Sequence, residues 1–181
     1  MPTRGKQCST EQMPFIKDKF PTYNGFANAS VQDILGDKLN SALHLKVTDF
    51  HSMVFINEGG KMLAKYLPNE AQVAPINGII TTDINKDGNL DLIIAGNNFD
   101  TEVETARYDA GTGLVLLGDG KGEFEALSCL ESGIFANKNV KDIKQLKNSD
   151  GENLIIVANN HGPLQIFESN AGKKEMIGSL Q

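Results

Sequence analysis

Apolar and polar positions follow different patterns in the two parts of the chain. Residues 1–42 contain short apolar clusters without regular alternation, which is typical of short helices joined by loops. From residue 43 onward, short β-branched and aliphatic runs are separated by Gly, Asn and Asp, as in successive antiparallel strands. The sequence therefore predicts a mainly β fold that is preceded by a helical and loop segment.

Two capping signals place helices in the first segment. Ser9 with Gln12 and Ser30 with Asp33 each have the spacing of a capping box, in which two side chains satisfy free N–H groups at the start of a helix. Gly36 is expected to break the second helix, because glycine disfavours a helix interior.

Ten strands and a weak eleventh are expected in the remainder of the chain. They cover residues 43–48, 53–56, 62–66, 78–82, 90–95, 114–117, 124–127, 140–145, 154–157 and 164–167, with the weak strand after Lys174.

Parts of this region recur along the chain. Residues 92–98 read LIIAGNN and return at 154–160 as LIIVANN, and MVFINEG at 53–59 resembles LVLLGDG at 114–120. A looser third copy of the latter begins at Leu164. Segments that repeat at a similar interval are usually one structural unit stacked on copies of itself.

Each repeat reads as a four-stranded blade of a β-propeller. Residues 76–128 and 139–180 form complete units and residues 43–67 a partial one, provided that the long loop 99–112 shrinks to 161–163 in the later copy. A propeller closes with about four to eight blades, so these two and a half leave sheet faces uncovered. We therefore expect the chain to be the C-terminal part of a longer polypeptide that supplies the remaining blades.

The most specific chemical signal is the acidic loop at residues 83–91, DINKDGNLD. Side-chain oxygens fall at its positions 1, 3, 5 and 9, a backbone carbonyl is available at position 7, and Gly88 allows a sharp turn at position 6. Calcium takes six to eight oxygen ligands, so this spacing predicts one Ca²⁺ site. The expected ligands are Asp83, Asn85, Asp87, Asn89 and Asp91.

The flanks of the loop decide its structural setting. Helical calcium loops need an acidic residue at position 12, and that position is Ile94. The β-favouring flanks instead place the loop between adjacent strands, where the alternative is a metal-free turn rich in Asp, Asn and Gly.

Two other polar loops carry weaker signals. The corresponding loop at 146–153 lacks an acidic first residue, so we expect a polar turn there without tight calcium binding. The segment 118–122, GDGKG, is expected to be a hairpin turn and not a phosphate-binding loop, because no helix follows it.

The loop 99–112 is long for a connection between strands and is rich in charge. Long loops in compact domains are often functional, and its carboxylates Glu102 and Asp109 could serve acid–base catalysis. No nucleophile or histidine accompanies them in the sequence. The favoured interpretation is a loop that is held by a pair between Arg107 and a carboxylate and packs on a neighbouring blade.

Composition limits the possible partners. The net charge of −6 and the pI near 5.1 argue against nucleic acid and anionic membranes. No apolar run is long enough for a membrane span, and the first residues lack the apolar stretch of a secretory signal. Cys8 and Cys129 are expected to be free thiols, with a disulfide as the alternative for an exported protein.

The calcium loop and its flanks resemble a known family. Residues 78–95 are similar to the FG-GAP or VCBS repeat of integrin-α-like propellers, with Asn85 in place of the middle Asp of the loop, and LVLLGDGKGEF at 114–124 is similar to the hairpin that ends such a repeat. QMPFIKDKFPTYNGFA, YLPNEAQ and TEVETARYDAGTGLVLLGDG resemble the C-terminal region of bacterial VCBS-repeat proteins related to the cartilage acidic protein group. The resemblance implies an extracellular or cell-surface propeller, seven-bladed in integrins, that is not catalytic and binds partners on one rim.

Three functions follow from these observations. The first is a calcium-binding module for binding or scaffolding, whose protein or glycan ligand the sequence leaves open. The second is part of a carbohydrate-active or other hydrolytic propeller that uses acids of loop 99–112. The third is a structural end-piece that completes a propeller ring.

Overall fold

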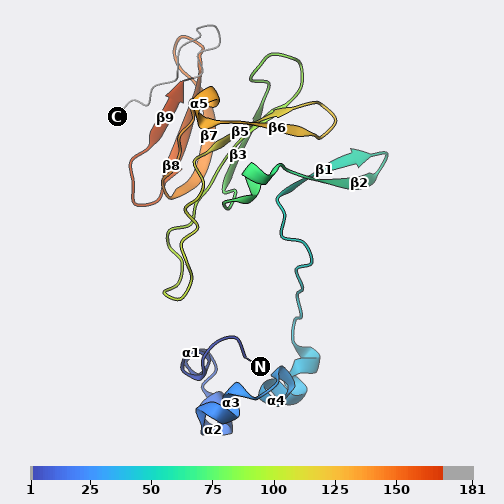
Figure 1. The fold of residues 1–181 in the computed structure, drawn as a ribbon, viewed down its shortest axis with the longest axis vertical. Coiled ribbons are helices and arrows are strands. Elements are labelled where there is room, and N and C mark those ends of the chain that lie inside the picture. Colours follow the sequence, from blue (N-terminus) through green and yellow to red (C-terminus); the bar gives the residue numbers. More distant parts are fainter. Residues whose placement is uncertain (1, 169–181) are drawn as a thin grey trace. The chain divides into compact units, whose positions relative to one another are not determined.

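The computed structural model describes residues 2–168 (Figure 1). The chain divides into two compact units, residues 1–49 and 50–181, and each is described by itself. The weak strand expected after Lys174, and with it the end of the predicted blade 139–180, lies outside the described residues.

The N-terminal unit consists of short helices. They are α1 (Lys6–Gln12), α2 (Phe15–Lys19), α3 (Tyr23–Ala27), α4 (Val31–Leu35) and the 3₁₀-helix η1 (Gly36–Ser41). Ile16, Phe26, Ala29 and Ile34 form its buried core, in which the rings of Phe20 and Phe26 meet edge to face at 5.8 Å. Four short helices are more than the two that were expected, because the capping pattern marks only some helix starts.

One of the two predicted capping boxes is confirmed. Ser30 Oγ accepts a hydrogen bond from the N–H of Asp33 at 3.1 Å, and Asp33 Oδ2 accepts one from the N–H of Ser30 at 2.8 Å. Gly36 ends this helix as expected, with a φ of 57° that favours glycine. The box at Ser9 is wrong, because α1 already begins at Lys6 and the N–H of Ser9 bonds within the helix to Gly5 O.

The strand expected at residues 43–48 is also wrong. These residues have no regular structure, and Leu43 and Leu45 are 85% and 78% exposed. Alternating apolar positions suit a half-buried strand, but a strand also needs a neighbour for its hydrogen bonds. No described segment pairs with this one.

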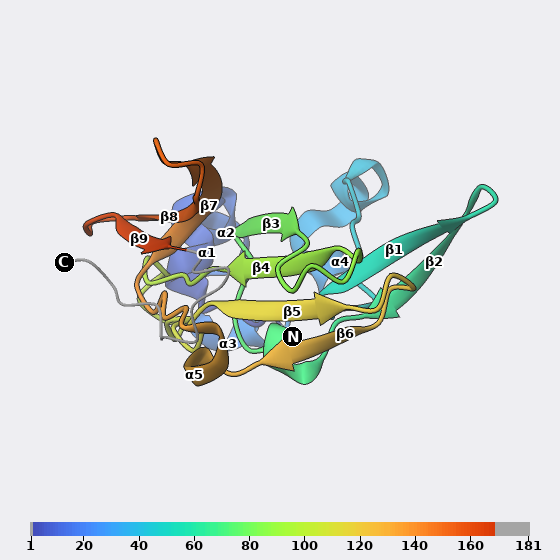
Figure 2. The same cartoon turned by 90° about the horizontal axis from the view of Figure 1, so that it is seen from above.

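The second unit is mainly β, as predicted, and its strands are antiparallel. A hairpin, a four-stranded sheet and a three-stranded sheet, here called the hairpin, the central sheet and the third sheet, make it up (Figure 2). Their strands in order are β1 (Met53–Glu58) and β2 (Lys61–Tyr66); β3 (Gly78–Thr82), β4 (Asp91–Ala95), β5 (Leu114–Gly118) and β6 (Phe124–Leu127); and β7 (Val140–Lys147), β8 (Asn153–Asn159) and β9 (Gln165–Glu168). Two short helices were not expected, η2 (Asn69–Gln72) and α5 (Cys129–Ser132).

Strand pairing corrects the alignment of the third repeat. Ile93 pairs with Val115 in the central sheet, and Ile155, which matches Ile93, pairs with Phe167 in the third sheet. Phe167 therefore takes the place of Val115, whereas a copy that begins at Leu164 would put Gln165 there. The shift of two residues keeps the same face of the strand, since side chains alternate with a period of two.

The central sheet buries both of its faces. One face packs on the third sheet through residues such as Ile80 and Ile93, and the other packs on Leu67, Ala71 and the hairpin residue Val54. Strands covered on both faces read as continuous apolar runs, as β4 does.

The central and third sheets meet through matching faces. Ile93 of the central sheet and the matching Ile155 of the third sheet belong to the same core. Where β3 meets β7, a Cβ on Gly78 would lie 2.6 Å from the backbone nitrogen of Ile143, so only glycine fits. Blades related by rotation around a ring would instead bring opposite faces together.

Candidate calcium site

The predicted calcium loop joins β3 to β4 at the edge of the central sheet. Thr82 pairs with Asp91 at the base of the loop, and no helix flanks it. The expected position between two antiparallel strands is therefore confirmed. Lys86 and Gly88 have positive φ angles of 62° and 90°, which curl the chain back on itself.

Asp83, at the first loop position, holds the turn. Its Oδ1 accepts a hydrogen bond from the N–H of Asp87 at 3.1 Å, and its Oδ2 accepts one from the N–H of Gly88 at 3.0 Å. The carboxylate thus faces the inside of the loop, where the third and fifth positions also lie.

Asn85 and Asp87 bond to each other and to the backbone. Asn85 Oδ1 accepts a hydrogen bond from the N–H of Asp87 at 3.0 Å, and Asn85 Nδ2 donates to Asp87 Oδ2 at 2.9 Å. Asp87 Oδ1 accepts from the N–H of Asn89 at 2.7 Å. The bonds from Asn89 and then Asn85 lower the pKa of Asp87, because they stabilise its charged form.

Asp91, at the ninth position, differs from the others because it is fully buried. Its Oδ2 accepts a hydrogen bond from the N–H of Ile84 at 2.7 Å, and its Oδ1 accepts one from the N–H of Gly118 at 2.9 Å. Asp91 therefore ties the start of the loop to the end of β5. Ile84 packs against the core between the sheets and so lies away from the loop interior.

The chemical type of the five expected donors suits calcium. Three carboxylates and two asparagines supply only oxygen ligands, which this hard cation prefers. In the described part of the chain, no group of three or more His, Cys, Asp or Glu side chains converges closely enough to hold a metal ion. Calcium binding would require Asp83 and Asp87 to turn from the loop N–H groups toward a common point.

The corresponding loop of the third sheet is closed by Asn148. Its Oδ1 accepts hydrogen bonds from the N–H groups of Asp150 at 3.0 Å and Glu152 at 2.8 Å. The loop is a polar turn between β7 and β8, as predicted. The absence of tight calcium binding there stays a prediction.

The segment 118–122 is the predicted hairpin turn, and it joins β5 to β6. Asp119 Oδ1 accepts hydrogen bonds from the N–H groups of Lys121 at 2.7 Å and Glu123 at 2.9 Å, and these bonds lower the pKa of Asp119. The acidic residue serves the turn itself.

Loop 99–112 is closed at its base by the buried Asn97. Asn97 Nδ2 donates hydrogen bonds to the carbonyl oxygens of Gly111 and Lys138, both at 2.9 Å, and Asn97 Oδ1 accepts one from the N–H of Gly111 at 2.9 Å. One side chain therefore joins both ends of the loop and connects them to the chain that leads into β7.

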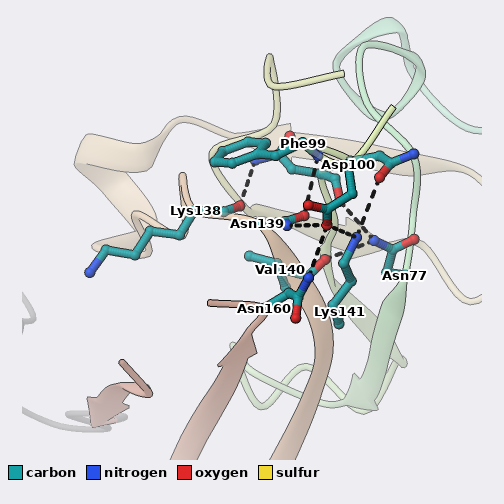
Figure 3. Close-up of polar contacts among 10 residues, drawn as sticks. Asn77, Phe99, Asp100, Lys138, Asn139, Val140, Lys141 and Asn160 are labelled. Atoms are coloured by element: carbon teal, nitrogen blue, oxygen red, sulfur yellow. Dashed lines mark hydrogen bonds and ion pairs between the residues drawn. The ribbon is translucent and has the colours of Figure 1, made fainter. Parts of the chain in front are cut away.

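Asp100 fixes the same loop to the third sheet (Figure 3). Its Oδ2 accepts hydrogen bonds from Asn139 Nδ2 at 2.8 Å and Asn160 Nδ2 at 2.9 Å, and Lys141 Nζ lies 3.9 Å away. The bonds from Asn139 and then Asn160 lower the pKa of Asp100. The only sequence signal for this junction is the Asn-Asn pair that ends both LIIAGNN and LIIVANN, and sequence reasoning did not use it.

The predicted Arg107 pair is present in loop 99–112. Arg107 Nε lies 3.8 Å from Asp109 Oδ2, and the guanidinium stacks over the ring of Phe99 at 4.1 Å. Glu102 Oε1 accepts a hydrogen bond from the hydroxyl of Thr105 at 2.9 Å. The acids proposed for catalysis thus have partners within the loop.

The cysteines are free thiols, as expected, and Cys129 is exposed. Within residues 2–168, no helix has the length and apolar character needed to cross a lipid bilayer. Comparison of the chain with protein-family models, with curated proteins and with solved structures found no match.

Proposed function

We propose that this protein is a non-catalytic, calcium-binding module that binds one Ca²⁺ in the loop 83–91. The single observation that carries the proposal is the position of five oxygen donors at alternate loop positions between β3 and β4. Asp91 is already held in place by the backbone, so the ion would complete a loop with one fixed end. Calcium would then stabilise the central sheet by binding the folded state alone.

Titration of the full chain with calcium tests the site. We expect calorimetry to give one bound ion and the thermal midpoint to rise with calcium and fall with chelator. Asp87→Ala removes an exposed ligand and should abolish both effects. The matched control is Asp150→Ala, at the corresponding Asp-Gly of the third sheet, which should respond to calcium like the parent. A calcium response that survives Asp87→Ala would show that the ligands lie elsewhere.

The central and third sheets are proposed to be blades of a propeller that a longer extracellular or cell-surface polypeptide completes. The strand order of the central sheet and the sequence repeats support this arrangement. The meeting of matching faces in one core weighs against a simple rotation between these two sheets. Small-angle scattering of the chain, alone and joined to its upstream region, distinguishes a closed ring from two sheets packed as a sandwich.

A further inference from the structure

A groove on the second unit lies apart from the calcium loop. It has a volume of about 890 Å³ and is open to solvent. It is lined by the segment that leads into β3, by Asn98, Tyr108 and Lys141, and by Phe50 and Ser52. Its size is within the range of ligand-binding sites, roughly 300–1,000 Å³.

The groove contains an aromatic residue, Tyr108, whose backbone is held in place by hydrogen bonds. Tyr108 and Asn98 exchange two backbone hydrogen bonds of 2.8 and 2.9 Å, which form an isolated antiparallel bridge. The Tyr108 side chain is nevertheless 53% exposed. Phe50 lines the same groove and is also exposed. An accessible ring on a fixed backbone offers a flat apolar surface for a ligand.

Amide groups are held beside this ring. Asn77 Nδ2 donates to the carbonyl oxygens of Val140 at 2.7 Å and Asn97 at 3.1 Å, which fixes the amide and leaves its Oδ1 outside every hydrogen bond described for this residue (Figure 3). Asn98 Oδ1 has only a long contact of 3.5 Å, from Lys141 Nζ.

The charge of the groove is nearly balanced. Lys141 is its single charged lining residue, and the ammonium lies 3.9 Å from the carboxylate of Asp100 (Figure 3). An anionic ligand would therefore meet little free positive charge. An apolar ligand would strip water from amides and an ammonium without replacing their hydrogen bonds, which is unfavourable.

We propose that this groove binds a neutral oligosaccharide. A sugar ring has an apolar C–H face that packs on an aromatic ring and hydroxyl edges that both donate and accept hydrogen bonds. Tyr108 supplies the stacking surface, and the amides of Asn77 and Asn98 with the Lys141 ammonium supply donors and acceptors. This site goes beyond the proposed calcium binding and shares no residue with it.

The test is a calorimetric titration of the full chain with neutral tetrasaccharides of glucose, xylose, mannose and N-acetylglucosamine, and with a sulfated heparin tetrasaccharide. At least one neutral probe should bind, and Tyr108→Ala should weaken its binding about tenfold or more through the lost stacking. Tyr108→Phe keeps the ring and should stay within about threefold of the parent. Tyr23→Ala, an exposed tyrosine of the N-terminal unit, serves as the control and should leave binding unchanged.

Three results would overturn the proposal: no neutral probe binds, only the heparin probe binds, or Tyr108→Ala binds as tightly as the parent. Thermal unfolding of each variant shows whether it is folded. Asp87→Ala, tested in parallel, separates the two sites: it should lose calcium binding and keep sugar binding, which supports both assignments.

Discussion

Two loops at corresponding places in the central and third sheets close in different ways. The loop between β3 and β4 uses three carboxylates, of which Asp91 is buried and bonds to two separate backbone segments. The loop between β7 and β8 is shorter, and the single side chain of Asn148 accepts the bonds that close it. One amide is enough to close the shorter turn, whereas the first loop places three carboxylates in a small space, and this excess of acids is the reason for the calcium proposal.

Replacement of the buried Asp91 should give the largest difference in stability between the two loops. Asp91→Ala leaves two backbone N–H groups without acceptors, and we expect it to lower the free energy of unfolding by about 3 kcal/mol. Asn153→Ala, at the matching position of the third sheet, should cost less than about 1 kcal/mol. Urea denaturation measures both. Equal losses would mean that Asp91 is not the anchor of its loop.

The asparagines after the two LII runs, Asn97 and Asn159, should also differ in how much they stabilise their sheets. Asn97 is buried and makes three hydrogen bonds to backbone groups, so Asn97→Ala should cost about 2 kcal/mol. Asn159 donates to Pro163 O and Gln165 Oε1, while its buried Oδ1 has no described partner. Asn159→Ala should therefore cost about half as much in the same denaturation experiment.

Substitution of the glycine in each of the two turns by alanine should lower stability by similar amounts. Gly88 and Gly151 have φ angles of 90° and 82° with open space around the position of a Cβ. Alanine at either site is strained by its backbone alone, and each substitution should cost about 1 kcal/mol. A much larger loss at Gly88 in calcium than in chelator would show that the first loop tightens around the ion.

Acid should weaken the junction between loop 99–112 and the third sheet. The folded-state pKa of Asp100 is lowered by Asn139 and Asn160, so its contribution to stability is present above the unfolded pKa, about 3.9, and is lost as the pH falls through the folded value. Thermal midpoints measured from pH 6 to pH 2 should show this loss. The thermal midpoint of Asp100→Asn should fall less than that of the parent over this pH range. If both midpoints fall with the same slope, Asp100 does not contribute to the pH dependence of stability.

Local patterns gave much of the β architecture. The strands at 78–82 and 124–127 are found at their expected bounds, and the loop after β3 lies between strands as its flanks indicate. These features depend on neighbours in sequence, where apolar runs and turn residues are informative.

Features that depend on distant residues were not predictable in the same way. The strand predicted at residues 43–48 is absent because the segment has no sheet partner among the described residues. The roles of Asn97 and Asp100 depend on Lys138 and Asn139, which follow some forty residues later in the sequence. The register of β9 was likewise hidden, because loop 99–112 has no counterpart of similar length. The groove that is proposed to bind a sugar is also assembled from segments that are separate in sequence.

The close approach at Gly78 has a consequence for the order of folding. The backbones of β3 and β7 approach each other closely there, and the contact between Gly78 and Ile143 joins residues that are far apart in the sequence. Contacts of such sequence separation are slow to form. The two sheets should therefore dock after each has formed. A bulkier residue at Gly78 would clash with β7 and should slow this docking step while both sheets still form.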